Sequence, residues 1–419
     1  MIKVSTSSKP VVLATSILTS IAVAAGSTSV AHAQSSQADP SATGSSLSSS
    51  SSPESSENSD QRFRELIANS SQRPLSSIAA IEAVLSSVTL PGSSAFSVPD
   101  DFVELPEGYP YPVDPTITEV RLVNRETSPQ SPSAAERRIE RWTVASPSMG
   151  RNILVDVRPT AESEGPIVVM LDGVEAPIRS GWLYGPGEEE IDETFGDEPA
   201  TLVFPLDANG TWYADWAEDD PKLGRQKWET FIMEELLPLI EEQPDIQFNG
   251  KRAIGGLSMG ATGAVHLAAT HPDKFDGVFG LSGCYSTMDS IGYQITSAVV
   301  ESRGGDVTNM FGPYGSEQWR RHNTVAHPEG LANMPVYLSA ADGGISPVPT
   351  EDESSTEGMV VGYVLENGVL QCTRNLDNAM RAAGMTHQKV HYKGDGRHNW
   401  ENFEEELEPA WQHIRPALY

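Results

Sequence analysis

The sequence is poor in cysteine, with only Cys284 and Cys372 among its 419 residues. Two thiols cannot build a tetrahedral metal site alone, and they permit at most one disulfide. This excludes a cysteine-built metal centre. The length suggests one large or two medium domains.

Basic residues are also scarce. Lys and Arg number 28 against 58 Asp and Glu, which gives a formal net charge of −30. A surface of this sign repels phosphate backbones, so we expect no nucleic-acid partner.

Long apolar runs are missing beyond the first residues. Residues 1–33 are typical of a secretory signal, with a basic start at Lys3 and Lys9 and an apolar stretch from Val11 to Ala25. Small residues at 31–33 suit a signal peptidase, and an uncleaved membrane anchor is the alternative. We therefore expect a secreted protein, either extracellular or associated with the cell envelope.

The composition divides the remainder into three parts. Residues 34–60 are mostly Ser and predict a disordered linker, because they offer almost nothing to bury. Residues 61–135 predict a partly helical N-terminal extension, with apolar side chains at helical spacing over 61–90 and a Pro-rich connector over 90–115. Residues 136–419 predict the catalytic domain.

The sequence of residues 136–419 alternates between two kinds of segment. Short, largely apolar runs predict strands buried on both faces of a mostly parallel sheet. They are Ile153–Val157, Ile167–Leu171, Thr201–Pro205, Arg252–Leu257, Val278–Leu281, Val336–Ala340 and Lys389–Tyr392. Helical patterns lie between them, at Trp228–Glu242, Met259–Thr270 and Arg374–Ala383. The alternation predicts an α/β fold with a central sheet flanked by helices.

The strongest chemical signal is Gly256-Leu257-Ser258-Met259-Gly260, which lies between a predicted strand and a predicted helix. A G-x-S-x-G match in this context predicts a nucleophile elbow, the sharp turn that exposes the serine of an α/β-hydrolase fold. The turn leaves no room for Cβ atoms beside the serine, which explains the glycines. A plain Gly-rich turn is the bland alternative.

A serine hydroxyl needs a base, and the chain has nine histidines. His398 lies in a loop between the last predicted strand and a final helix, where this fold places its base. For the acid that orients the base, Asp342 follows a predicted strand and Glu366 lies farther on, before the helix predicted at Arg374–Ala383. The local pattern favours Asp342 modestly and leaves both open.

An oxyanion hole needs two backbone N–H groups. The amide of Met259, directly after the nucleophile, is one candidate. The turn after the strand Ile167–Leu171 offers the amide of Val174 as the second, although an ordinary surface turn would read the same way.

With these residues in place, the chain resembles the secreted mycolyltransferases of mycolic-acid bacteria, which are α/β-hydrolase relatives of the esterase D group. The likeness covers residues 150–415 and fits the corynebacterial branch. The blocks that carry it are Leu171-Asp172-Gly173, Ser180-Gly181-Trp182, Lys227-Trp228-Glu229-Thr230-Phe231, Gly256-Leu257-Ser258-Met259, Met310-Phe311-Gly312-Pro313 with Trp319, and His398-Asn399-Trp400-Glu401.

The resemblance implies a Ser–Glu–His triad, and its spacing selects Glu366 over Asp342. It also implies that Asp172 and Trp400 contact the sugar. The family usually carries an arginine where this chain has Glu175, and its short-loop disulfide has no counterpart at residues 218–227.

The resemblance therefore implies transfer of mycolyl groups between trehalose esters, or from a trehalose mycolate donor onto cell-wall arabinogalactan. The sugar acceptor resolves a Ser258 acyl-enzyme, and no metal or cofactor is required. A secreted carboxylesterase acting on simpler esters has the same residues. A non-catalytic cell-wall-binding protein that kept the fold is the third possibility.

We also predict a disulfide between Cys284 and Cys372. Cys284 follows the strand Val278–Leu281, and Cys372 lies six residues after Glu366. Export would place both thiols where disulfides persist.

Overall fold

The computed structural model describes residues 105, 108–160, 163–343 and 356–419. The predicted signal, the Ser-rich linker and the helices predicted over 61–90 lie outside these residues.

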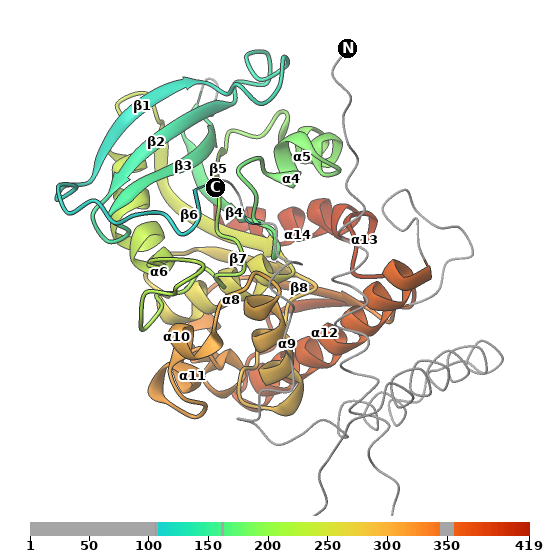
Figure 1. Ribbon diagram of the computed structural model, residues 1–419. Helices are drawn as coiled ribbons and strands as arrows, with labels where there is room; N and C mark the ends of the chain where they lie inside the picture. Colours follow the sequence, from blue (N-terminus) through green and yellow to red (C-terminus); the bar gives the residue numbers. More distant parts are fainter. Residues whose placement is uncertain (1–104, 106–107, 161–162, 344–355) are drawn as a thin grey trace, which may run out of the picture.

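A nine-stranded sheet forms the centre of the molecule (Figure 1), with the strand order β1-β2-β3-β5-β4-β6-β7-β8-β9. Strands β1, β2, β3 and β5 are paired antiparallel, and the pairs from β5 through β4, β6, β7 and β8 to β9 are parallel. The strands are β1 (Arg121–Thr127), β2 (Glu140–Ser146), β3 (Arg151–Arg158), β4 (Gly165–Leu171), β5 (Thr201–Pro205), β6 (Phe248–Leu257), β7 (Gly277–Leu281), β8 (Val336–Ala341) and β9 (Lys389–Lys393).

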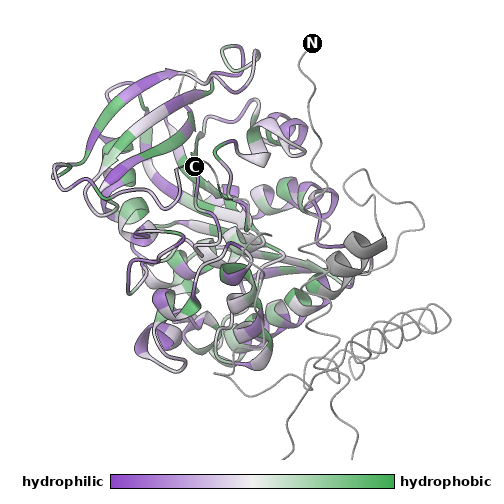
Figure 2. Ribbon diagram, in the orientation of Figure 1, coloured by the Kyte–Doolittle hydropathy of each residue, from purple (hydrophilic) through white to green (hydrophobic). Residues whose placement is uncertain are grey.

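Strand β4 contributes to the core on both faces of the sheet, because successive side chains of a strand point to opposite sides. Ile167, Val169 and Leu171 join one buried cluster. Val168 and Met170 join the other. An apolar run without alternation is thus what a strand covered on both faces requires, and Figure 2 shows apolar segments along the central strands.

Helices cover both faces. One cluster is completed by α4 (Gly181–Tyr184), α5 (Glu188–Phe195), α13 (Trp400–Glu404) and α14 (Leu407–Ile414). The opposite cluster includes α6 (Trp228–Thr230), the π-helical turn η1 (Phe231–Leu236), α7 (Leu237–Glu241), α8 (Met259–Thr270) and α12 (Thr356–Ala382). Beside α8 and α12 lie α9 (Ser290–Glu301), α10 (Val307–Phe311), α11 (Glu317–Arg321) and the short turns η2 (Thr324–Ala326) and η3 (Pro328–Leu331); η5 (Arg415–Ala417) ends the chain.

The predicted strands and the helix after Ser258 are present, and two regions differ from expectation. Strands β1 and β2 carry no unbroken apolar run, and β1 lies before residue 136, inside the segment predicted as an extension. The helix predicted at Arg374–Ala383 is the last third of α12, so Glu366 lies within a helix and not before one.

The predicted disulfide is confirmed. Cys284 and Cys372 are bonded, with their Cα atoms 4.8 Å apart. The bridge joins the segment after β7 to the middle of α12, where Val369 packs against it. The helix that carries Glu366 is thereby tied to the sheet.

Among the described residues, every helix is either too short or too polar to cross a bilayer.

Candidate active site

Ser258 lies in the turn between β6 and α8. Its backbone has φ 53° and ψ −120°, a conformation that non-glycine residues rarely adopt. A Cβ on Gly256 or Gly260 would lie 2.6 or 2.4 Å from the carbonyl oxygen of Leu171. Both glycines are therefore required by the close approach of α8 to β4, as the motif predicts.

His398 brings its ring to this serine. Its Nε2 lies 2.8 Å from Ser258 Oγ, and its Nδ1 lies 2.8 Å from Glu366 Oε2. The His398 side chain is 9% exposed, and that of Glu366 is fully buried. Three side chains from separate parts of the fold thus form one hydrogen-bonded row, hereafter the catalytic row.

The second oxygen of Glu366 is fully engaged. Oε1 accepts hydrogen bonds from Ser282 Oγ and the Ala341 N–H, each at 2.7 Å, and from Asn402 Nδ2 at 3.3 Å. These donors stabilise a buried carboxylate and leave Oε2 for the imidazole. Sequence reasoning missed Ser282 and Asn402, and the only signal was the place of Asn402 four residues after His398.

Asp342 does not reach the imidazole ring. It is an exposed residue after β8, and its N–H donates to the carbonyl of Lys393. Its own carbonyl accepts from Asn367 Nδ2 at 2.8 Å. The structure therefore brings Glu366 to His398 and leaves Asp342 at the surface.

The two amides predicted for the oxyanion hole belong to the residue after Ser258 and to the turn after β4. A Cβ on Gly173 would lie 3.5 Å from Ser258 Cβ, so the turn after β4 passes beside the nucleophile. The Val174 carbonyl accepts from the Gly210 N–H, and Met259 opens α8. Within the described residues, neither the Val174 nor the Met259 amide donates to another residue. Both amides are thus available to a ligand.

Asp172 lies at the end of β4 with a buried side chain. Oδ1 accepts a hydrogen bond from the Gly181 N–H at 3.3 Å. Oδ2 is buried and has no hydrogen-bond partner among the described residues. Burial raises the pKa of Asp172 to about 7, because the charged form loses its hydration.

Trp400 begins α13, two residues after His398. Its indole lies against Gly181 so closely that a Cβ there would come within 2.2 Å of Cζ2. The ring also meets Trp182 edge-on, with centroids 5.1 Å apart. Trp400 is partly exposed and Trp182 is buried, so only the former offers an aromatic surface to a ligand.

Glu175, which stands where the resembling family carries an arginine, projects into solvent with 75% of its side chain exposed. Its carboxylate lies 3.7 Å from Arg303 Nη2, from the segment after α9. A guanidinium is thus present near this position, although it comes from a different part of the chain.

Away from the serine, Glu229, His266 and His322 each bring a possible metal-ligand atom within 4.8 Å of the others. The guanidinium of Arg321 donates to the Glu229 carboxylate and lies 3.5 Å from His266 Nε2. Burial lowers the pKa of both histidines, to about 4 for His322. An arginine already supplies the positive charge here, so the cluster fits a buried ion pair better than a metal.

Comparison with known proteins gives the family. The family model described as putative esterase matches residues 146–414, more than half of the chain. The diacylglycerol acyltransferase/mycolyltransferase Ag85A of Mycobacterium leprae is 27% identical over 64% of this chain and 80% of its own length. The corresponding Ag85B of Mycolicibacterium smegmatis is 28% identical over 67% and 85%.

Solved structures show the same fold. Mycobacterium tuberculosis MPT51 superposes with a TM-score of 0.55 at 24% identity, covering 65% of this chain and 96% of that one. An S-formylglutathione hydrolase from Agrobacterium tumefaciens reaches 0.50 at 13% identity, covering 71% and 100%. The predicted α/β-hydrolase fold is confirmed, and the chain belongs to the putative esterase family, among the relatives of the mycolyltransferases.

Proposed function

We propose that this protein is a secreted serine acyltransferase that moves mycolyl groups between trehalose esters or onto cell-wall arabinogalactan. The observation that carries the proposal is the catalytic row, in which His398 lies 2.8 Å from both Ser258 Oγ and Glu366 Oε2. These are hydrogen-bond distances suited to proton transfer. We infer the identity of the acyl group from the likeness to the mycolyltransferases.

In the first half-reaction, Ser258 Oγ attacks the ester carbonyl of the donor while its proton passes to His398 Nε2. The Glu366 carboxylate holds the Nδ1 proton and stabilises the imidazolium that forms. The Val174 and Met259 amides receive the developing oxyanion. His398 then returns the proton to the departing trehalose oxygen, and the acyl group remains as an ester on Ser258.

The second half-reaction reverses these roles. A sugar hydroxyl attacks the acyl-enzyme as His398 Nε2 removes its proton, and Ser258 is released with that proton. Water can take the same place and would give hydrolysis. Positioning a bound hydroxyl can favour transfer by roughly 7 kcal/mol or more, so the outcome depends on how the sugar is held.

Asp172 and Trp400 support sugar binding. The free Asp172 Oδ2 can accept a hydroxyl hydrogen bond, and the partly exposed indole of Trp400 is a flat apolar surface on which a sugar can stack. Gly181 contacts both residues, so carboxylate and indole form one wall beside the serine.

Incubation of the purified protein with trehalose monomycolate tests the proposal, with lipid products identified by mass spectrometry. We expect trehalose dimycolate and free trehalose. Ser258→Ala should abolish both products and also prevent labelling by a serine-directed phosphonate.

Two outcomes would replace the proposal. Release of free fatty acid alone, even with abundant sugar acceptor, would identify a carboxylesterase. Failure to label with phosphonate and to cleave any ester would identify a non-catalytic wall-binding protein.

A further inference from the structure

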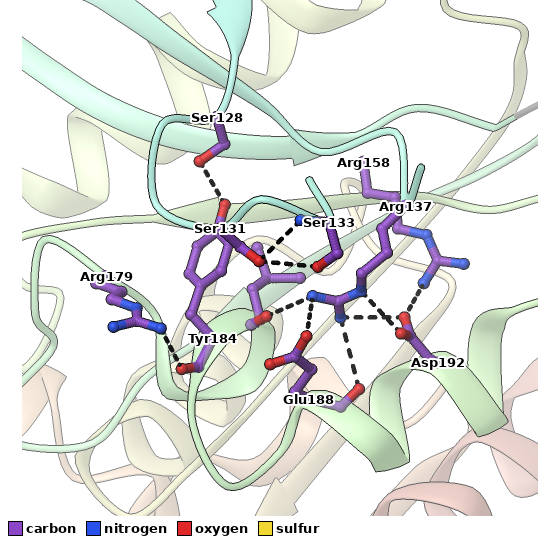
Figure 3. Close-up of polar contacts among 10 residues, drawn as sticks. Ser128, Ser131, Ser133, Arg137, Arg158, Arg179, Tyr184, Glu188 and Asp192 are labelled. Atoms are coloured by element: carbon purple, nitrogen blue, oxygen red, sulfur yellow. Dashed lines mark hydrogen bonds and ion pairs between the residues drawn. The ribbon is translucent and has the colours of Figure 1, made fainter. Parts of the chain in front are cut away.

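One guanidinium, that of Arg137, joins the loop between β1 and β2 to the segment 178–188 (Figure 3). Its Nη1 donates to the Leu183 carbonyl at 2.6 Å and to Glu188 Oε1 at 3.0 Å. Its Nε and Nη2 grip the two carboxylate oxygens of Asp192 at 2.8 and 3.0 Å. The Arg137 side chain is only 10% exposed, whereas the carboxylates of Glu188 and Asp192 are each 41% exposed.

Further contacts connect the same two regions. Ser128 is the residue directly after β1, and its Oγ accepts a hydrogen bond from Tyr184 Oη at 2.5 Å. Arg141 in β2 pairs with the buried Asp156 and donates to the Ile178 carbonyl at 2.9 Å. Both ends of the segment 178–188 are therefore held by the hairpin formed by β1 and β2.

The segment needs such support because it is weak on its own. Helix α4 has four residues, and short helices are marginal without tertiary contacts. Glycines at 181, 185 and 187 add backbone freedom that must be lost on folding. Yet this segment places Gly181 against Asp172 and against the Trp400 indole. A shift of the segment would displace both proposed sugar contacts.

We propose that Arg137 is a positioning residue: it holds the segment 178–188 in place, and Gly181 of that segment supports the sugar-acceptor wall formed by Asp172 and Trp400. The inference rests on the proposed function, since it gives that wall its role. Arg137 precedes the residues 146–414 that match the family model. The hairpin before the matched region would thus contribute to acceptor selection without touching the catalytic row.

The test compares acylation with acyl transfer in Arg137→Ala, Arg137→Lys and Asp192→Asn. We expect the acceptor KM of Arg137→Ala to rise about tenfold, with phosphonate labelling and hydrolysis of a small nitrophenyl ester within about twofold of wild type. Arg137→Lys keeps the charge but lacks the forked geometry, so it should restore only part of the acceptor binding. Asp192→Asn breaks the network from α5 and should act in the same direction.

Arg125→Ala is the matched control. Arg125 lies in the same hairpin and is paired with Glu140 and Asp245, away from the segment 178–188. It removes the same charge and a similar set of bonds, and we expect no change in acceptor KM. Hydrogen exchange of residues 180–191 should accelerate in Arg137→Ala and stay unchanged in Arg125→Ala.

The proposal and the function on which it rests can fail separately. If acylation and acceptor use fall together in Arg137→Ala, or if exchange in 180–191 does not change, Arg137 does not position the wall. If the wild type transfers no acyl group to sugar, the proposed function fails on that result, and the acceptor role fails with it whatever the exchange shows.

Discussion

The catalytic row and the proposed acceptor wall, formed by Asp172 and Trp400, are built differently. Glu366 is fully buried and each of its oxygens has a partner. Asp172 is equally withdrawn from water, yet its Oδ2 has no partner among the described residues. Glu366 therefore has all its hydrogen bonds without a ligand, whereas Asp172 Oδ2 still lacks a donor among the described residues.

This difference suits Glu366 to proton transfer and Asp172 to ligand binding. A fully bonded carboxylate is held in one orientation, as proton transfer through His398 requires. A buried oxygen without a hydrogen bond costs free energy that a ligand can recover by donating one. We therefore expect substitutions in the row to change turnover, and substitutions in the wall to change acceptor binding.

The largest expected effect comes from Glu366→Gln. The amide keeps the shape but cannot stabilise the imidazolium, so kcat should fall roughly 10³- to 10⁴-fold in an ester hydrolysis assay. Asp342→Asn is the matched control and should retain wild-type activity. The reverse pattern would show that the contact with His398 is not functional.

Removing the disulfide should cost less, and the cost should appear in stability. Cys284→Ser with Cys372→Ser frees two points that are 88 residues apart. The free energy of unfolding should fall by about 4.6 kcal/mol in the chain-entropy model, as measured by urea denaturation. Either single variant should lose the same amount, because either one abolishes the bridge. An unchanged urea midpoint would contradict this prediction.

Comparison of Asp172→Asn with the wild type should show the raised pKa of Asp172 as a difference in how stability depends on pH. The folded pKa is about 7 against 3.8 for the free group. Between these values the folded state keeps a proton that the unfolded state has lost, so wild-type stability falls as pH rises. The slope should approach about 1.4 kcal/mol per pH unit.

Asp172→Asn has no such proton, so its stability relative to wild type should increase from pH 4.5 to 7 and level off above. Chemical denaturation of both proteins at each pH measures the difference. A difference that does not vary with pH would contradict the raised pKa.

The smallest expected effect is that of Trp400→Leu. Loss of the stacking surface is worth about 1 kcal/mol, so acceptor KM should rise about fivefold while ester hydrolysis is unchanged. Tyr419→Leu, which removes an exposed aromatic residue at the C-terminus, is the control. A fall in hydrolysis equal to the loss of transfer would erase the distinction between row and wall.

The parallel half of the fold was predictable because its signals are local. Strands β4, β6, β7 and β8 are short apolar runs, and the glycines around Ser258 mark the turn between β6 and α8. Strands β1 and β2 were not predicted, because β1 is largely exposed and β2, although mostly buried, has charged and polar residues among its apolar ones. Their side chains therefore lack the continuous apolar run that identifies the central strands.

The sequence by itself determined the proposed nucleophile, the proposed base and the cysteines available for a bridge. Ser258 and His398 stand in short motifs whose geometry follows from glycine and from chain order. Local pattern alone did not separate Glu366 from Asp342, and the family resemblance was needed to favour Glu366. A carboxylate's place in the chain does not say which helix face it will occupy.

Only the tertiary structure decided how the site is completed. It placed Glu366 inside α12, turned its Oε1 toward Ser282 and Asn402, and brought Arg137 to the segment 178–188. These contacts join residues that are 36 to 84 positions apart around Glu366 and 46 apart at Arg137. No local pattern encodes them, because they form only when the sheet brings distant segments together.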